Sequence, residues 1–165
     1  MISNTSDNND IKLQLDEFFL DSDSLMLATV NGEGHPEASY TPYVEHDGCY
    51  YIFVSELASH TTNLKQSGVA NVLFLENQYD GHAYTRKRFN CFCKVKVIDQ
   101  VNAIFEPRMQ QMEEQFGKLI VTLRGLNDFH LFQLSPVKGN FVAGFGQSFE
   151  VDFSPGGGIR HRRPN

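Results

Sequence analysis

The residues from Phe89 to Ile98 constrain the fold of this chain more than any other segment. Their apolar members, Phe89, Cys91, Cys93, Val95 and Val97, alternate with Asn90, Phe92, Lys94, Lys96 and Ile98. Successive side chains of a β-strand point to opposite faces of the sheet. The pattern therefore predicts a long strand with one continuously apolar face and one face that is at least partly wet.

Shorter apolar runs predict further strands, separated by turn residues. Asn31-Gly32 lies between the runs 25–30 and 35–44, and His46-Asp47-Gly48 leads into 49–54, so three antiparallel strands follow one another. The remaining runs are 69–75, 129–134 and 137–145, with Ser135-Pro136 breaking the last two. Short meandering strands with few helices favour a mostly β (α+β) fold, an antiparallel β-barrel of six to eight strands.

Three segments have the features of peripheral helices. Asp10 is placed to cap a helix over 11–20, and Ser55 one over 56–66 that ends at Gly68. The third helix, 106–116, has Pro107 in its first turn and Gly117 as its stop.

Composition excludes several classes of protein. The net charge of −6 over 165 residues argues against a general affinity for nucleic acid. The first ten residues are polar and acidic, so we expect no signal peptide, and no apolar run is long enough for a membrane span. The three cysteines, Cys49, Cys91 and Cys93, are an odd number, which favours free thiols and a reducing, cytoplasmic setting.

We expect one domain with two flexible ends. Residues 1–9 are predicted to be disordered, 10–153 to form the barrel domain, and 154–165 to be a flexible Gly-rich basic tail.

Two groups of basic residues are candidate ligand contacts. Arg86-Lys87-Arg88 directly precedes the long strand, where cations could bind phosphate or carboxylate groups or could simply be solvated. In the tail, His161 lies between arginines, and its imidazole could coordinate a metal or heme iron. A solvated chain end is the alternative interpretation of that tail.

Several motifs together resemble the pyridoxamine 5′-phosphate oxidase-like, FMN-binding split-barrel superfamily. In the first half of the chain they are LATVNGEGHP (27–36), SHTTNL (59–64) and Arg86-x-Arg88-Phe89. In the second half, NDFHLF (127–132) and GNFVAGFGQSF (139–149) resemble the heme-utilisation (HugZ/HutZ-like) branch. The resemblance covers roughly residues 12–153, and the G-x-F-V-x-G-F-G pattern is its most specific element.

This resemblance implies a homodimer of split barrels with ligand sites at the subunit interface. The implied activity of the heme branch is heme binding and, in some members, oxidative opening of the ring to release iron. By position, His161 is the implied axial ligand, and Asp128 is implied to orient that histidine from the partner subunit. Arg88 corresponds to a basic residue near the heme propionates, with Arg86 as a second candidate.

Two alternatives remain open beside a heme-degrading protein. A simple FMN-binding oxidoreductase of the same superfamily would place Ser39, Ser59, Lys65, Arg86 and Arg88 around the flavin phosphate. A non-enzymatic heme carrier would have the heme site without turnover. We rank heme first because the resemblance in the second half of the chain is the more specific one.

Overall fold

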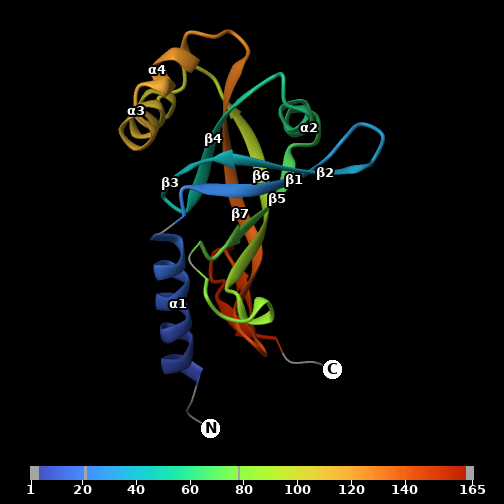
Figure 1. The fold of residues 1–165 in the computed structure, drawn as a ribbon, viewed down its shortest axis with the longest axis vertical. Helices are drawn as coiled ribbons and strands as arrows, with labels where there is room; N and C mark the ends of the chain where they lie inside the picture. Colours follow the sequence, from blue (N-terminus) through green and yellow to red (C-terminus); the bar gives the residue numbers. More distant parts are fainter. Residues whose placement is uncertain (1–3, 21, 78, 163–165) are drawn as a thin grey trace.

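The computed structural model describes residues 4–20, 22–77 and 79–162, and strands dominate this part of the chain (Figure 1). The helices are α1 (Asn4–Leu20), α2 (Ser59–Ser67), α3 (Phe105–Phe116), α4 (Leu119–Arg124) and the short 3-10 helix η1 (Ala83–Thr85). The strands are β1 (Ser24–Val30), β2 (Pro36–Pro42), β3 (Val44–His46), β4 (Cys49–Ser55), β5 (Val69–Leu75), β6 (Arg88–Ile98), β7 (Phe129–Gly144), β8 (Gln147–Asp152) and β9 (Ile159–His161).

All strand pairs are antiparallel, and the sheet has the order β2-β1-β5-β6-β7-β4-β3. β7 is the element that divides the sheet. The edge of β7 away from β6 pairs with β4 over Phe129–Leu134 and with β8 over Lys138–Gly144, and β9 continues beyond β8. The sheet thus separates into two parts, which Figure 1 shows above and below the middle of the molecule.

Pro136 lies inside β7 rather than between two strands, which corrects the predicted break at Ser135-Pro136. The register of β6 and β7 shifts at Phe92/Cys93, so one residue of β7 bulges out of the ladder beside Pro136. Proline has no N–H to donate, and a bulge is a position where a strand tolerates it.

Two apolar clusters hold the helices against the sheet. The larger cluster is inside the barrel and includes Phe74, Phe89 and Phe141, all fully buried, with Phe18 and Phe19 of α1 packed against it. The smaller cluster lies between the sheet and the α3–α4 pair, around Met109 and Met112. The predicted mostly β, antiparallel fold with peripheral helices is confirmed. The described residues form nine strands rather than six to eight, a number that includes the three-residue strands β3 and β9.

The chain ends are more ordered than the sequence suggested. α1 begins at Asn4 rather than Ile11, since Ser, Asn and Asp are suited to the first turn of a helix. In the tail, a Gly-rich turn reverses the chain so that β9 pairs with β8, and Ile159 packs on the core. Residues 1–3 and 163–165, which belong to the two segments predicted to be flexible, lie outside the described residues.

Two other helix predictions also needed correction. α2 begins at Ser59, because Ser55 does not cap it: the Ser55 hydroxyl accepts the N–H of Leu57 and donates to Asp128. Gly117 ends α3 with a φ of 79°, but the chain enters a second helix, α4, two residues later.

Candidate functional site

The predicted site residues lie in separate parts of the fold. Arg86 lies between η1 and β6, Arg88 begins β6, and His161 ends β9; these elements are in the lower half of Figure 1. Asp128 directly precedes β7, and Lys65 is in α2, in the upper half. Ser39 in β2 and Ser59 in α2 make up a third group of predicted site residues, apart from the other two.

A hollow of about 550 Å³ lies beside the hairpin of β7 and β8. Its lining includes Tyr84, Arg88, Val142, Phe145, Ser148 and Arg162, and we call it the arginine hollow. Arg88 reaches it from the position opposite Val142, and the backbone N–H of Arg162 donates to the Ser148 carbonyl at 2.7 Å. Tyr84 and Phe145 are largely exposed, so the hollow offers two aromatic side chains as well as two guanidinium groups.

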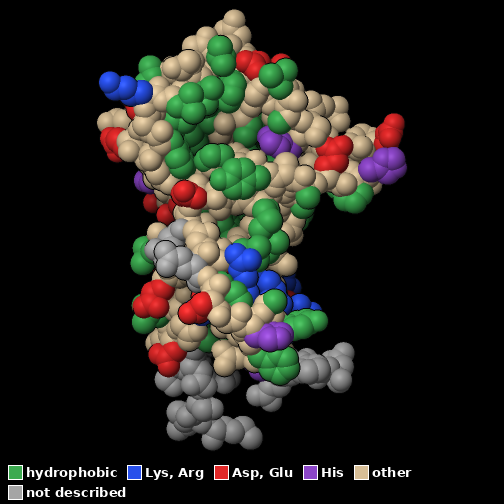
Figure 2. All heavy atoms as spheres, in the orientation of Figure 1, with side chains coloured by type: hydrophobic (Ala, Val, Ile, Leu, Met, Phe, Trp, Pro, Cys, Tyr) green, Lys and Arg blue, Asp and Glu red, His purple; other side chains and the backbone are tan. Residues whose placement is uncertain are grey.

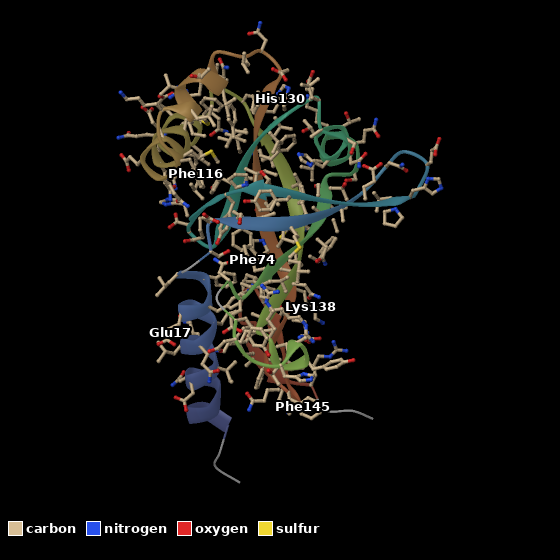
Figure 3. All side chains as sticks on the ribbon, viewed as in Figure 1. Glu17, Phe74, Phe116, His130, Lys138 and Phe145 are labelled. Carbon is tan, nitrogen blue, oxygen red and sulfur yellow. The ribbon has the colours of Figure 1, made fainter. Side chains whose placement is uncertain are left out.

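Positive charge is concentrated near this part of the molecule. Figure 2 shows a group of Lys and Arg side chains over the lower half of the visible face, where Figure 3 labels Lys138 and Phe145. Arginine forms bidentate hydrogen bonds with planar carboxylates and binds phosphates well. The arginine hollow is therefore suited to an anionic ligand with an aromatic body.

Arg86 does not point its guanidinium at that ligand position. Its Nε and Nη2 both donate to the carbonyl oxygen of Glu76, at 3.0 and 2.6 Å. This pair of bonds ties the start of β6 to the end of β5. Of the two arginines that the sequence suggested, Arg88 is the one that lines the hollow.

His161 lies on the other face of the sheet from Arg88. It pairs with Phe149 in the ladder, and the two rings are 5.0 Å apart. Phe149 in turn is opposite Phe141, whereas Arg88 is opposite Val142. Because directly paired residues share a face and successive residues alternate, one chain cannot direct both side chains to one side of its sheet.

Asp128 and Lys65 belong to a polar group at the upper end of β7. Asp128 accepts a hydrogen bond from Ser55 at 2.5 Å. Glu56 accepts from Lys65 at 2.6 Å and contacts Nε2 of His130 at 2.7 Å, and these partners lower the pKa of the Glu56 carboxyl. The charge of Lys65 is therefore already paired within the chain.

Ser39 and Ser59 lie beside an acidic group. The Ser39 hydroxyl is 2.8 Å from Nδ1 of His60, and a hydrogen bond from Ser59 is the main cause of the lowered pKa of Glu37. His60 is only 7% exposed, and burial lowers its pKa. Among the described residues, its Nε2 has no hydrogen-bond partner. A carboxylate and a neutral imidazole make this position unsuitable for a phosphate.

The length of β7 separates these groups. Val142, opposite Arg88, is 13 residues beyond Phe129, the neighbour of Asp128. At about 3.3 Å per residue this corresponds to roughly 40 Å along the strand. Figure 3 shows the same separation, with His130 near one end of the molecule and Phe145 at the other.

The sequence marked Arg162 only as part of the basic tail and did not mark Tyr84. Arg162 belongs to the basic tail that the sequence singled out, but only the pairing of β9 with β8 brings it to the hollow. Tyr84 lies in η1, in a connection where the sequence predicted no element.

The described ranges contain neither a metal-ligand cluster nor a helix suited to a membrane. No three His, Cys, Asp or Glu side chains come together as a metal site. Among the described helices, none has the length and apolarity needed to cross a membrane.

Comparison with known proteins places the chain in a family. The model of the pyridoxamine 5′-phosphate oxidase family matches residues 11–143. The chain is also 32% identical over 139 residues to HutZ of Vibrio cholerae serotype O1, which is named a heme oxygenase, covering 84% of this chain and 79% of HutZ.

Solved structures agree with this assignment. HutZ of Vibrio cholerae, described there as a heme storage protein, is similar with a TM-score of 0.71 at 29% identity over 76% of this chain and 89% of HutZ. ChuZ of Campylobacter jejuni has a TM-score of 0.83 at 29% identity, covering 95% of this chain but 65% of ChuZ. An FMN-binding, pyridoxamine 5′-phosphate oxidase-related protein of Nostoc punctiforme, 14% identical, has a TM-score of 0.66 over 99% of this chain and 100% of its own. These likenesses confirm the split-barrel fold, and the chain belongs to the pyridoxamine 5′-phosphate oxidase family.

Proposed function

We propose that this protein binds heme at the arginine hollow and degrades it oxidatively, releasing iron. The observation that carries the proposal is the meeting of Arg88 and Arg162 in one hollow with two exposed aromatic side chains. A heme needs apolar contact for its ring and cations for its two propionates. The similarity to HutZ over most of the chain supports heme as the ligand.

The positive charge of the arginine hollow makes it a better candidate heme site than the other large pocket. That second pocket, beside α1, contains Asp16 and Glu45, and none of the described residues that line it is Lys or Arg. Carboxylates would repel the propionates, whereas guanidinium groups attract them. The arginine hollow is thus the better heme site of the two.

A complete heme site would require a second copy of the chain. His161 and Arg88 lie on opposite faces of the sheet, and Asp128 is far along β7 from both. A homodimer offers the missing side chains from the partner. Exposed apolar side chains gather on the outer face of β2, β1, β5 and β6, and this face is the proposed interface: Val30, Tyr40, Val69 and Phe92.

Replacing Phe92 by glutamate is expected to weaken dimerisation at least about tenfold. Phe92 is 41% exposed in the single chain, so the change would place a charge in the proposed interface without disturbing the core. Sedimentation velocity measures the dissociation constant. The control is Leu119→Glu in α4, away from this face and 64% exposed. Equal dissociation constants for the two variants would contradict this interface.

Replacing His161 by alanine is expected to remove or strongly shift the heme Soret band. We propose that the His161 imidazole is the axial ligand of the heme iron, and alanine has no ligand atom. The ring is exposed and rests against Phe149, so its loss should leave the fold intact. Absorbance spectra of the hemin complexes test this, with His46→Ala at the β3–β4 turn as the control. An unchanged spectrum would mean that His161 is not the ligand.

Turnover separates an enzyme from a carrier. Incubation of the hemin complex with ascorbate in air, with an iron chelator present, supplies electrons and dioxygen. An enzyme would lose its Soret band and release chelatable iron, with catalase added to exclude attack by free peroxide. A persistent Soret band would show that the protein is a heme carrier.

FMN is the second candidate ligand, favoured by the family and by an FMN-binding structural neighbour. Its predicted phosphate contacts are dispersed: Ser59 bonds to Glu37, Lys65 is paired with Glu56, and Arg86 binds a backbone carbonyl. Flavin absorbance in the purified protein, or uptake of added FMN that is lost in Arg88→Ala, would establish the flavin alternative.

We place this activity in the cytoplasm. Cys49, Cys91 and Cys93 are all free thiols in the structure. Free thiols are typical of reducing compartments. Thiol labelling of protein from intact cells tests this, and a disulfide between two chains would contradict it.

A further inference from the structure

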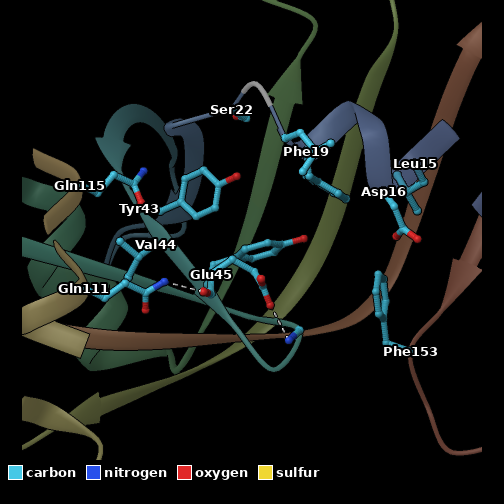
Figure 4. A pocket seen from close by; sticks show the side chains of 13 residues that line it. Leu15, Asp16, Phe19, Ser22, Tyr43, Val44, Glu45, Gln111, Gln115 and Phe153 are labelled. Atoms are coloured by element: carbon cyan, nitrogen blue, oxygen red, sulfur yellow. Dashed lines mark hydrogen bonds between the residues drawn. The ribbon is translucent and has the colours of Figure 1, made fainter. Parts of the chain in front are cut away.

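A second pocket, of about 610 Å³, lies on the side of the barrel covered by α1 (Figure 4). It is bounded by the C-terminal half of α1, the β3–β4 hairpin, α3 and the segment after β8. Its lining includes Asp16, Phe19, Tyr43, Glu45, Gln111 and Phe153, and we call it the acidic pocket. Its volume is in the range of pockets that hold small organic molecules.

Two carboxylates reach the acidic pocket from different elements. Figure 4 shows Asp16 extending from α1 on one side and Glu45 from β3 on the other. Oε1 of Glu45 accepts the N–H of Gly48 at 2.7 Å, which fixes this side chain while Oε2 stays available. In the described part of the chain, the carboxylate of Asp16 has no hydrogen-bond or salt-bridge partner, and the pocket lining contains no Lys, Arg or His.

An amide holds the backbone that carries Glu45. Nε2 of Gln111 in α3 donates to the Glu45 carbonyl at 2.9 Å, as the dashed line in Figure 4 shows. Its Oε1 is buried and therefore offers no surface to a ligand. The side-chain acceptors that carry charge in the pocket are the carboxylates of Asp16 and Glu45.

Four aromatic side chains, Phe19, Tyr43, Tyr50 and Phe153, form part of the remaining walls, beside Leu15, Leu20 and Val44. The rings of Tyr43 and Tyr50 are 5.5 Å apart, and those of Phe19 and Tyr50 are 6.2 Å apart. Aromatic faces attract cations as well as apolar groups. The pocket therefore combines an aromatic wall with acceptors and negative charge.

We propose that the acidic pocket binds an organic cation: a flat apolar body that carries a primary ammonium or amidinium group. The ring system would lie against the aromatic walls, and the cationic N–H groups would donate to the carboxylates of Asp16 and Glu45. This site differs from the arginine hollow in position and in the sign of its charge, so it does not depend on heme binding.

Three probes with the same ring system but different charge test the proposal: 1-naphthylmethylamine (a cation), 1-naphthylmethanol (neutral) and 1-naphthaleneacetate (the carboxylate anion). Equilibrium dialysis against the full-length protein, read by naphthalene absorbance, gives their affinities. We expect the amine to bind about five- to tenfold more tightly than the alcohol, because its ammonium group would form partly exposed ion pairs with Asp16 and Glu45. The carboxylate probe should bind most weakly. Equal affinities for all three, or no binding of the amine, would overturn the proposal.

Charge-removing variants locate the binding. Asp16→Asn and Glu45→Gln are each expected to weaken amine binding about two- to fivefold, and together to abolish the preference over the alcohol. Glu17→Gln, the next residue of α1, removes the same charge outside the acidic pocket and should leave the affinity unchanged. If Glu17→Gln weakened binding as much as Asp16→Asn, the amine would be responding to net charge and the site would be rejected.

Discussion

Replacing Arg88 by alanine is expected to weaken hemin binding roughly ten- to hundredfold, the loss of one or two hydrogen bonds to a charged group. Arg88 projects from the start of β6 into the arginine hollow, and its Nη1 donates to the carbonyl of Arg86 at 3.1 Å. That bond positions the guanidinium and leaves its other N–H groups for a propionate. Arg88→Ala removes the cation but no core packing, so titration of the variant with hemin measures binding alone.

The control for this variant is Lys118→Ala. Lys118 is exposed between α3 and α4, outside both the hollow and the proposed interface. It should leave the affinity within about twofold, since distant exposed charges are largely screened by salt. Arg162→Ala should weaken binding in the same direction as Arg88→Ala. Similar losses for Arg88→Ala and Lys118→Ala would indicate attraction by overall charge rather than a site.

Replacing Phe74 by alanine is expected to lower the free energy of unfolding by about 3–5 kcal/mol. Phe74 in β5 is fully buried and belongs to the larger apolar cluster inside the barrel. Its ring centroid lies 5.1–5.3 Å from those of Phe19, Tyr43 and Tyr50. The substitution would leave a cavity where α1, the connection between β2 and β3, and β4 pack against β5. Urea unfolding followed by circular dichroism gives the change in free energy.

Leu119→Ala is the matched control for this stability measurement. Leu119 in α4 is 64% exposed, so its truncation should change stability by no more than about 0.5 kcal/mol. If Phe74→Ala lowered the free energy of unfolding by less than about 1 kcal/mol, the packing of α1 against Phe74 would be contradicted.

Local patterns predicted most of the fold because they act over a few residues. The alternation of Phe89–Ile98 is present in β6, and the turn at Asn31-Gly32 joins β1 to β2. Predictions failed where a distant partner decided the structure. Pro136 stays in a strand only because β6 pairs along β7 on both sides of a bulge, and β9 exists only because β8 is beside it.

The candidate site was less predictable for the same reason. The sequence marked Arg88 by its place before a strand, and the structure puts it in a hollow. The sequence could not show that His161 pairs with Phe149, and this pairing decides which face of the sheet the His161 side chain is on. Nor could it show that Ser59 and Lys65 find carboxylate partners, because Glu37 and Glu56 become neighbours only in the folded chain. The roles of these residues in ligand binding stay predictions.

The central claim is that the arginine hollow is a heme site, and a hemin titration tests it most directly. Purified protein is titrated with hemin and followed at the Soret band, beside the double variant Arg88→Ala/Arg162→Ala. The account predicts a saturable band at one heme per chain, and at least a tenfold weaker titration for the variant. A band that never saturates, or identical curves for the two proteins, would contradict it.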